Sequence, residues 1–460
     1  MTATAAAPKR ESQTKVAFAT LVGTTIEWYD FFIYAQAAGL VFATLFFEPA
    51  GAQIALLLSF ASVGISFLFR PLGAFLAGHY GDKLGRRLML VLTLVLMGAA
   101  TTLIGLLPTY AQVGVAAPIM LLLLRILQGI SAGGEWGGAV LMSVEHAPAG
   151  SRGRAGSVPQ LGVPLGMLLA SGVMALMTGV ISPGDAFLEW GWRVPFLLSI
   201  VLIVLGYFIR RSVDESPVFK EISERKVQTA APTAVLFKRH WFVVLLAALV
   251  FAGNGSSGYM ITGGYLTNYT TAELGMDRTP VLLVMTLGAF GWLVSTFVSG
   301  FLADKIGRRK TYLVGWVTLG LMSFPLFWMV NTAELGMLVG AVLLFSVGLG
   351  LTYGPQASWY SEIFPADVRF SGVSISYAIG AILGGAFAPT IATWLVQTTG
   401  TTTAVSVYLL SMVVVATVAT LILRDRQGIN LSINNVDEQR VGITVFDKEE
   451  KSDDLVGSSR

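Results

Sequence analysis

The sequence contains no cysteine, and its charged residues are scarce. Without cysteine there can be no disulfide bond, thiolate metal site or cysteine nucleophile. Only 12% of the 460 residues are charged and 54% are hydrophobic, whereas about 25% of an ordinary soluble domain is charged. A soluble protein of this length needs a polar surface that this composition cannot supply. The composition therefore predicts an all-α protein that crosses a membrane several times.

Motifs for metal and nucleotide chemistry are also missing. The three histidines, His79, His146 and His240, have none of the spacings that bind a metal ion. The chain has no G-x-x-x-x-G-K-[ST] phosphate-binding loop and no polar region large enough to hold a nucleotide. No group of nucleophiles or ligands indicates an enzyme, and we expect no cofactor. An ion gradient, rather than ATP, is the expected energy source.

Twelve apolar runs are long enough to cross a bilayer, which needs about 20 residues per helix. They form two sets of six. The first set covers 16–46, 54–79, 88–107, 115–145, 157–182 and 191–210, and the second covers 241–270, 280–302, 311–330, 335–361, 370–396 and 403–423. We therefore predict six-helix bundles at 16–210 and 241–424, a polar linker at 211–240, and tails at 1–15 and 425–460.

Basic residues are distributed unevenly between the connections. The even-numbered connections hold the central linker and Lys83, Arg86, Arg87, Arg152, Arg154, Lys305, Arg308, Arg309, Lys310 and Arg369. The odd-numbered connections hold only Arg193 and Arg278. Because cytoplasmic loops carry the excess of lysine and arginine, we expect both termini and the linker on the cytoplasmic side.

The two sets of runs carry matching segments. GHYGDKLGRR at 78–87 follows the second run, and GFLADKIGRR at 300–309 follows the eighth. Segments 145–152 and 362–369 repeat a glutamate, a proline and an arginine at the same spacing. The pattern indicates two copies of a six-helix unit in the same orientation. Repeats of this kind place a substrate path between the two halves.

The repeated loops resemble those of the major facilitator superfamily, and the resemblance covers roughly residues 15–425. It implies a fold of two six-helix pseudo-repeats and a cytoplasmic gate formed by Gly78, Asp82, Gly85, Arg86, Arg87, Asp304, Gly307, Arg308 and Arg309. Glycine permits the tight turn, and the aspartate can pair with an arginine or cap a helix. The alternative is that the loops only anchor the topology.

Four further segments are similar to the metabolite:proton symporter branch of that superfamily. They are IEWYDFF at 26–32, FRPLGAF at 69–75, LRILQGISAGGEWGGA at 124–139 and WGWRVPF at 190–196. The branch takes up shikimate, 2-oxoglutarate, citrate and other organic acids, or proline and betaine, together with a proton. The extended match in spans two to four most resembles the shikimate carriers. These motifs are specific for the branch and not for the substrate.

Five charged residues lie inside the apolar runs, all in the first half: Glu27, Asp30, Arg70, Arg125 and Glu135. Each such residue costs about 2.5–3.5 kcal/mol on insertion scales and usually faces the protein interior. The acids outnumber the cations, so one acid has reason to be protonated in some conformation. We expect Glu27 or Asp30, followed by Glu135, to carry a coupling proton, and Arg70 or Arg125 to bind a substrate carboxylate.

Structural roles for these residues stay open. The glycines around Glu135 let helices touch, so this acid can serve as a structural hydrogen-bonding group. Arg70 precedes Pro71 and can bond the carbonyls that the proline frees. Arg125 can be the structural partner of an acid, and Glu27 and Asp30 can be a packing pair.

The remaining candidate site residues are neutral. Gln128 and Tyr34 accompany the charges in the first half, and the second half offers Asn254, Tyr259, Tyr265, Tyr353, Gln356 and Trp359. Such donors and aromatic faces suit the hydroxyls and ring of a polyol acid. For each of them alone, ordinary packing or interfacial anchoring is the alternative.

These expectations describe a proton-coupled importer of a small organic acid. We expect a monomer in the inner membrane, with a small-molecule substrate, a proton and lipid as its partners and no nucleic acid. A symporter of proline or betaine is the first alternative, and a proton-driven exporter is the second. The tail after Gln427 lacks a sustained heptad pattern, which favours the organic acid, because osmosensing members of the branch can carry a coiled-coil tail.

Overall fold

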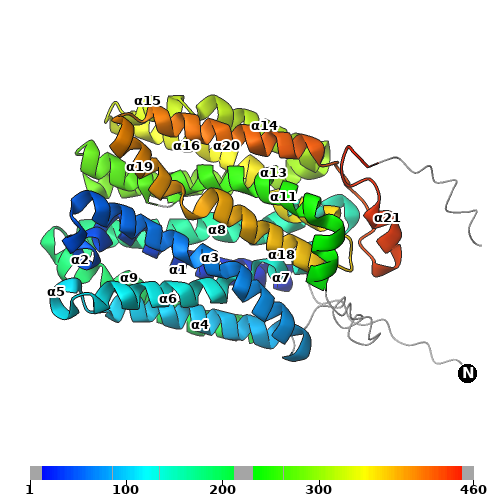
Figure 1. Ribbon diagram of the computed structural model, residues 1–460, viewed down its shortest axis with the longest axis horizontal. Helices are drawn as coiled ribbons and strands as arrows, with labels where there is room; N and C mark the ends of the chain where they lie inside the picture. Colours follow the sequence, from blue (N-terminus) through cyan, green and yellow to red (C-terminus); the bar gives the residue numbers. More distant parts are fainter. Residues whose placement is uncertain (1–12, 85, 134, 212–231, 263, 448–460) are drawn as a thin grey trace, which may run out of the picture.

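The computed structural model is an elongated bundle of helices (Figure 1). It describes residues 13–84, 86–133, 135–211, 232–262 and 264–447. At 13–16, 77–84, 86–90, 209–211, 232, 262 and 433 it describes the backbone only. All regular elements in these ranges are helices. The pairing of Leu423 with Thr444 is an isolated antiparallel bridge.

The first half of the chain supplies six spans. They are α1 (Gln13–Ala37) with η1 (Ala38–Phe42) and α2 (Ala43–Phe46); α3 (Ala52–Leu84); α4 (Arg86–Leu106); α6 (Ala116–Ala132) with α7 (Trp136–Glu145); α8 (Arg152–Leu176) with η4 (Met177–Ile181); and α9 (Arg193–Arg211). Short helices η2 (Glu48–Ala50), α5 (Tyr110–Val113), η3 (Ala149–Ser151) and η5 (Phe187–Gly191) lie in the connections.

The second half repeats the arrangement. Its spans are α11 (Pro232–Thr262) with α12 (Tyr265–Asn268) and η6 (Tyr269–Glu273); α13 (Arg278–Ile306); α14 (Arg308–Met322) with α15 (Pro325–Val330); α16 (Leu335–Tyr353) with α17 (Gln356–Ile363); α18 (Arg369–Gly380) with η7 (Ala381–Ala386) and α19 (Ala388–Thr399); and α20 (Thr403–Ile422). Two short helices follow, η8 (Ile433–Asn435) and α21 (Val436–Arg440).

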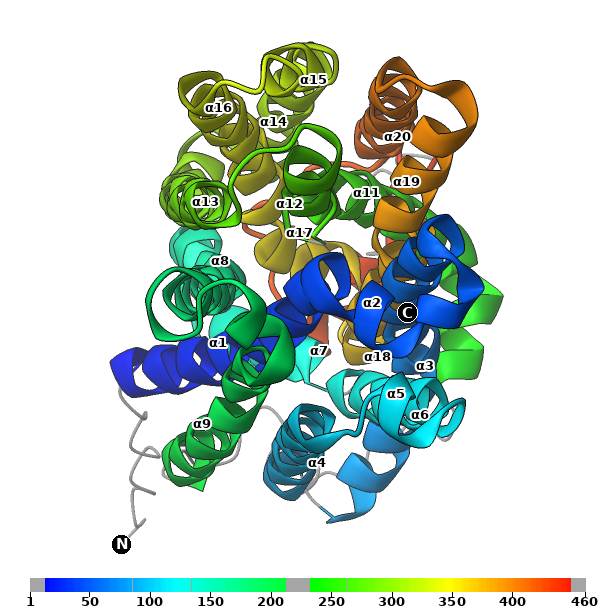
Figure 2. The ribbon, with the colours of Figure 1, turned by 90° about the vertical axis from the view of Figure 1, so that its left-hand side faces the viewer.

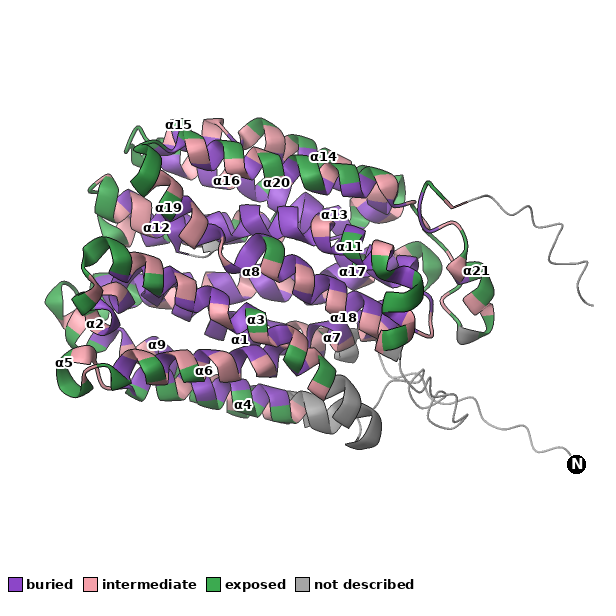
Figure 3. Ribbon diagram, viewed as in Figure 1, coloured by how far each residue is buried: buried purple, intermediate pink, exposed green. Residues whose placement is uncertain are grey.

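The twelve spans confirm the predicted fold. Ten helical stretches of the described chain are long and apolar enough to cross a membrane, and Val91–Leu106 in α4 is a shorter apolar helix. The combination of α14 and α15 completes the set. Buried residues line the inside of the bundle and exposed ones its outside (Figure 3). The outer surface includes large apolar side chains such as Leu321 and Phe208, as expected for contact with lipid.

The two halves lie side by side along the bundle axis (Figure 2). Helix α8 of the first half packs along α13 of the second, and α3 packs against α18, η7 and α19. The C-terminal segment with α21 lies at one end of the bundle (Figure 1), and we call this end the tail face. Helices α2, α5 and α15 lie at the opposite end.

Glycines bring α6 against α3, and this contact positions the charged residues of the first half. A side-chain carbon on Gly129 would lie 2.0 Å from the Ser66 carbonyl oxygen, and one on Gly133 would lie 2.0 Å from that of Arg70. Only glycine permits so close an approach of two backbones. The glycine-rich run at 129–138 therefore places Arg125 of α6 beside α3.

Candidate functional site

The five charged residues singled out in the sequence are all buried in the first half. Glu27 and Asp30 are on α1, Arg70 on α3 and Arg125 on α6, while Glu135 precedes α7. Each is at most 3% exposed. Their surroundings differ, and so does the chemistry that each can perform.

Arg125 is held in place by the neighbouring helix. Its guanidinium donates to the Ser62 carbonyl at 3.3 Å, to the Val63 carbonyl at 2.9 Å and to the Ser66 hydroxyl at 2.9 Å. It also lies 3.8 Å from the centre of the Tyr34 ring, a favourable cation–π contact. Tyr34 in turn shares a 2.7 Å hydrogen bond with Ser62. Arg125 thereby joins α6 to α3 and α1.

A chain of hydrogen bonds connects Arg125 with Asp30. Arg125 donates to the Gln128 side-chain oxygen at 2.8 Å, and the Gln128 amide donates to the Thr101 hydroxyl at 2.7 Å. The Thr101 hydroxyl interacts with the Asp30 carboxylate, which also accepts a 2.6 Å hydrogen bond from Ser199. Asp30 therefore faces α4 and α9, and its described hydrogen-bond partners are hydroxyl groups.

Arg70 lines a small cavity between the halves. Trp136 of the first half and Ser374 and Tyr377 of the second half share the lining, and the space is about that of one water molecule. The Arg70 guanidinium lies 4.3 Å from the centre of the Phe67 ring and interacts with Tyr377. Arg70 thus presents a positive charge at the interface, where the sequence repeats predict a substrate path.

Aromatic side chains of the second half close around this cavity. The Tyr377 ring is stacked between Trp136 at 3.9 Å and Phe251 at 4.3 Å. Tyr259 of α11 packs edge-on against Phe67 at 5.4 Å and lies within electrostatic range of Arg70, Arg125 and Glu27. Glu27 also lies within range of Tyr353 and Tyr377. Glu27 therefore faces the interface between the halves, unlike Asp30.

The Tyr259 hydroxyl is a buried polar group on this interface. Within the described part of the chain it has no hydrogen-bond partner. Leaving a buried hydroxyl unbonded is unfavourable. This hydroxyl is consequently available to a ligand that carries an acceptor.

Other predicted site residues do not join this group. Tyr265 stacks on Tyr269 at 6.0 Å, and Tyr269 bonds Asn331 in the connection after α15. Trp359 donates to the Arg424 carbonyl at 3.2 Å, beyond the end of α20. Both therefore lie near the ends of the bundle.

Asn254 and Gln356 lie within the second half. Asn254 donates to the Thr352 hydroxyl at 2.7 Å and ties α11 to α16. Gln356 is completely buried at the start of α17. Sequence reasoning missed Thr101 and Ser199, because hydroxyl residues are common in apolar helices, and it left out Trp136 despite its place in the GGEWGG run.

The repeated loop after the eighth span joins the two halves at the tail face. Asp304 accepts hydrogen bonds from the backbone N–H groups of Gly153 at 2.7 Å and Arg154 at 3.0 Å, so it caps the start of α8. It also forms an ion pair with Arg308 at 2.9 Å. Gly307 has a φ angle of 100°, which favours glycine. In the matching loop after the second span, Gly85 lies outside the described residues, and only the backbone of Gly78, Asp82, Arg86 and Arg87 is described.

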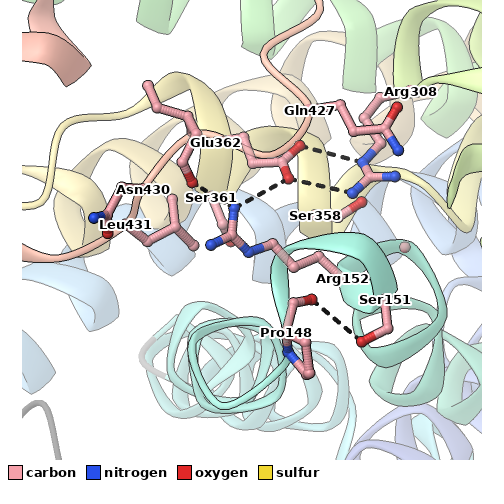
Figure 4. Close-up of polar contacts among 12 residues, drawn as sticks. Pro148, Ser151, Arg152, Arg308, Ser358, Ser361, Glu362, Gln427, Asn430 and Leu431 are labelled. Atoms are coloured by element: carbon pink, nitrogen blue, oxygen red, sulfur yellow. Dashed lines mark hydrogen bonds and ion pairs between the residues drawn. The ribbon is translucent and has the colours of Figure 1, made fainter.

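Ion pairs cross between the halves beside this loop, and Figure 4 shows the one between Arg152 and Glu362. Arg308 donates twice to Glu362, at 3.2 Å from both Nε and Nη2, and Arg152 of the first half lies 3.5 Å from the same carboxylate. Arg369 of the second half pairs with Glu145 of the first at 3.2 Å. The glutamate of each repeated 145–152 and 362–369 segment thus pairs with the arginine of the other half.

Arg309 completes this group of loop residues at the tail face. Its backbone N–H donates to Asp425 at 3.1 Å, and its guanidinium donates to the Leu421 carbonyl. These bonds attach the start of α14 to the end of α20 and the segment after it. They lie within the second half, unlike the crossed pairs.

Comparison with known proteins identifies the family. Residues 20–389 match the Major Facilitator Superfamily. The chain is 40% identical over 417 residues to the inner membrane metabolite transport protein YhjE of Escherichia coli K12, covering 89% of this chain and 94% of that protein. It is 34% identical to the shikimate transporter of the same organism, covering 90% and 95%, and 33% identical to a proline/betaine transporter of Salmonella typhimurium, covering 83% and 78%.

A solved structure shares the fold. The proton:xylose symporter XylE, bound to 6-bromo-6-deoxy-D-glucose, superposes with a TM-score of 0.74 at 19% identity, covering 91% of this chain and 97% of that one. The family match and the curated relatives indicate a transporter and not an enzyme. The chain therefore belongs to the major facilitator superfamily and is a multi-pass membrane transporter.

Proposed function

We propose that the protein imports a small organic acid together with a proton, across the inner membrane and by alternating access. The observation that carries this proposal is the cavity between the halves, where the Arg70 guanidinium lies among the rings of Trp28, Phe31 and Phe67. A guanidinium binds a carboxylate with charge-assisted hydrogen bonds. The Tyr259 hydroxyl, which has no hydrogen-bond partner in the described chain, suits a substrate with polar substituents.

Arg70 is the arginine that we assign to the substrate. Arg125 donates to three groups on α3 and to Gln128, so a substrate would have to displace bonds that hold the helices together. Arg70 lines the cavity instead, and its Nε atom is buried without a hydrogen-bond partner in the described chain. A carboxylate at this position would satisfy that donor.

Asp30 is the acid that we assign to the coupling proton. Its partners are the hydroxyls of Ser199 and Thr101, and a hydroxyl can donate to a carboxylate or accept from a carboxylic acid. Asp30 can therefore gain or lose a proton without breaking an ion pair. The Thr101 hydroxyl has one hydrogen, which can go to Asp30 or to the Met97 carbonyl 3.0 Å away. Movement of Arg125 would be transmitted to Asp30 through Gln128 and Thr101.

The link to substrate is electrostatic. Glu27 lies three residues before Asp30 on α1 and faces the interface near Tyr259 and Tyr377. The carboxylate of a substrate that binds Arg70 is repelled by Glu27 and by an ionised Asp30, because like charges in a low-dielectric interior interact strongly. Binding the acid together with a proton relieves this repulsion. Glu135 and its glycine-rich surroundings remain the third acid to test.

We also propose that the tail face is cytoplasmic and that Asp304, Arg308 and the crossed ion pairs form its gate. The described basic residues of the even-numbered connections lie at this end, and their excess is typical of cytoplasmic loops. Opening requires the pairs between the halves to separate. Both chain termini would then be in the cytoplasm, and the transporter would act as a monomer.

A zwitterionic osmolyte is the second candidate substrate. Proline and betaine also carry one carboxylate for Arg70, and the identity to the proline/betaine transporter is 33%, close to the 34% for the shikimate transporter. The acid is favoured by the Trp136–Tyr377–Phe251 stack, because Tyr377 has both ring faces covered and neither is open to a quaternary ammonium group.

Uptake into proteoliposomes tests the proposal. Purified protein is reconstituted, an inward proton gradient is imposed, and radiolabelled shikimate is followed with unlabelled dicarboxylates, aromatic acids, proline and betaine as competitors. Accumulation that collapses with a protonophore supports acid import. Accumulation of betaine and of no acid would overturn the substrate class. Accumulation only under an outward proton gradient would make the protein an exporter.

A further inference from the structure

The polar segment after α20 is folded onto the tail face, which its sequence pattern did not predict. We call residues 423–447 the tail strap. It turns back on itself, since the Arg424 N–H donates to the Ile443 carbonyl at 3.0 Å and the Val445 N–H donates to the Ile422 carbonyl at 2.9 Å. Arg426 donates to the carbonyls of Gln439 at 2.6 Å and Glu438 at 2.9 Å. Burial lowers the pKa of Arg426 to about 10.

The tail strap is bonded firmly to the second half. Gln439 is 1% exposed, and its side-chain oxygen accepts from the Ala366 N–H at 2.7 Å and from Arg369 at 3.0 Å. Its amide donates to two carbonyls of the strap itself. Gln427 donates to the Asp304 carbonyl at 2.8 Å. The strap therefore moves with α13, α17 and α18 when the halves move.

The two arginines that join the halves also donate to the tail strap. Arg152, which pairs with Glu362, donates to the Ile429 carbonyl at 2.6 Å. Arg369, which pairs with Glu145, donates to the Leu431 carbonyl at 3.0 Å. Figure 4 shows Arg152 between Glu362 and the strap residues Asn430 and Leu431. Each arginine of the two crossed ion pairs is thus bonded both to a glutamate and to a backbone carbonyl of the tail strap.

We propose that the tail strap is a latch that holds the tail face closed. Arg152 belongs to the first half, while Ile429 is fixed to the second half through the strap. Separation of the halves at this face therefore breaks the Arg152–Ile429 bond together with the Arg152–Glu362 pair, and each buried partner then needs new hydrogen bonds. The strap adds to the barrier against opening. The inference requires movement of the halves and is independent of the substrate.

The absence of cysteine makes the test direct, because one introduced thiol is the only thiol in the protein. Ser374 lines the cavity between the halves and is buried. Ser374→Cys is labelled with a membrane-impermeant maleimide in inside-out and in right-side-out vesicles. The ratio of the two labelling rates reports which face is open. The measurement needs no substrate, so a wrong assignment of the transported acid does not affect it.

Truncation after Gly428 removes the carbonyls of Ile429 and Leu431 and the Gln439 anchor. We expect labelling from the tail face to rise at least about tenfold relative to the opposite face, because the Arg152–Ile429 bond between the halves is lost and one hydrogen bond to a charged group contributes about 1.5–3 kcal/mol. Truncation after Asp447 retains every bond of the tail strap and is the matched control. An unchanged ratio in the shorter protein would overturn the latch.

A point variant protects the test against a truncated chain that fails to fold. Gln439→Leu keeps the side-chain size and removes all four of its hydrogen bonds. We expect a smaller change of the labelling ratio in the same direction. If the tail strap only stabilised the fold, this variant would lower the thermal midpoint and leave the ratio unchanged, and that result would also overturn the proposal.

Discussion

Arg70 and Arg125 are both buried guanidinium groups, and their hydrogen bonds predict different losses on substitution. For Arg70→Gln we expect at least about a tenfold rise in the half-saturating concentration of the acid, because a hydrogen bond to a charged group contributes about 1.5–3 kcal/mol. Arg70→Lys keeps the charge and should retain part of the affinity. Uptake kinetics measure both, with quantitative immunoblotting to correct for the amount of protein. An unchanged half-saturation in Arg70→Gln would remove Arg70 from the site.

Asp30 allows a sharper separation of binding from coupling. Asp30→Asn is nearly isosteric and keeps a group that bonds Ser199 and Thr101, but it cannot exchange a proton. We expect the variant to exchange labelled for unlabelled substrate across the membrane at a substantial rate. It should fail to accumulate substrate under an inward proton gradient. Glu27→Gln, the isosteric amide of the other acid on α1, is the matched comparison, and gradient-driven accumulation by Asp30→Asn would rule out Asp30 as the proton carrier.

At this scale the sequence predicted which residues are buried but not what they contact. Five charges in apolar runs had to face the interior, since each is unfavourable in lipid. The partners of Asp30 come from α4 and α9, far away along the chain, and nothing in the pattern singles out Thr101 or Ser199. Tyr265 and Trp359 were chosen by residue type, and only the structure places them near the ends of the bundle.

Gly153 lies where α8 of the first half packs closely against α13 of the second half. A side-chain carbon at this position would lie 2.6 Å from the Gly300 carbonyl oxygen and 2.6 Å from the Asp304 carboxylate. For Gly153→Ala we therefore expect destabilisation of the closed tail face by about 1–3 kcal/mol, as in other overpacked contacts. Labelling of Ser374→Cys from that face should increase accordingly.

Gly150 offers the control for this change. Nothing lies within 4 Å of a side-chain carbon at Gly150, so Gly150→Ala changes the same residue type close to the same helix start without a clash. Its labelling ratio should match that of the parent. Equal ratios for the two variants would show that α8 does not depend on the contact with Asp304.

The positions of the membrane-spanning helices could be predicted from the sequence, because contact with lipid determines their length and hydropathy. Length and hydropathy located twelve spans, because a helix must bury its backbone over the whole membrane thickness. Breaks inside the spans were not visible in the pattern. The run at 115–145 is divided into α6 and α7, and the run at 370–396 is interrupted by η7. The tail strap was missed for a related reason, since side-chain to backbone hydrogen bonds fold it and no apolar repeat marks it.

The crossed ion pairs act on the molecule as a whole. Glu145→Gln and Glu362→Gln each replace the acid of one pair by a neutral side chain of similar size. Each should favour opening at the tail face by about tenfold, because a buried arginine loses its counter-charge. In the double variant the effect should exceed that of either single variant without being their simple product, because Arg152 also interacts with Glu145 and Arg369 and the two pairs are coupled.

The ratio of labelling rates from the two faces is measured in the Ser374→Cys background for the two single variants and the double variant. A double variant that labels no faster than the more affected single variant would show that one pair alone controls the opening. Glu48 is an exposed acid two residues after α2, the helix that lies at the opposite end of the bundle. Glu48→Gln is expected to leave the ratio unchanged and serves as the control. Thermal midpoints recorded in parallel separate a shift between states from a loss of folding.

The crossed pairs have the symmetry of a dimer. Each half provides a glutamate and an arginine, and each receives the complementary group from its neighbour, as in the self-complementary interface of two identical subunits. A single six-helix unit could therefore have closed this face with a second copy of itself, before the two units were joined in one chain. The tail strap breaks that equivalence. It follows only the second half in the sequence, yet its carbonyls accept hydrogen bonds from the arginines of both halves. In a symmetric pair, each unit would need a segment of its own to make these bonds.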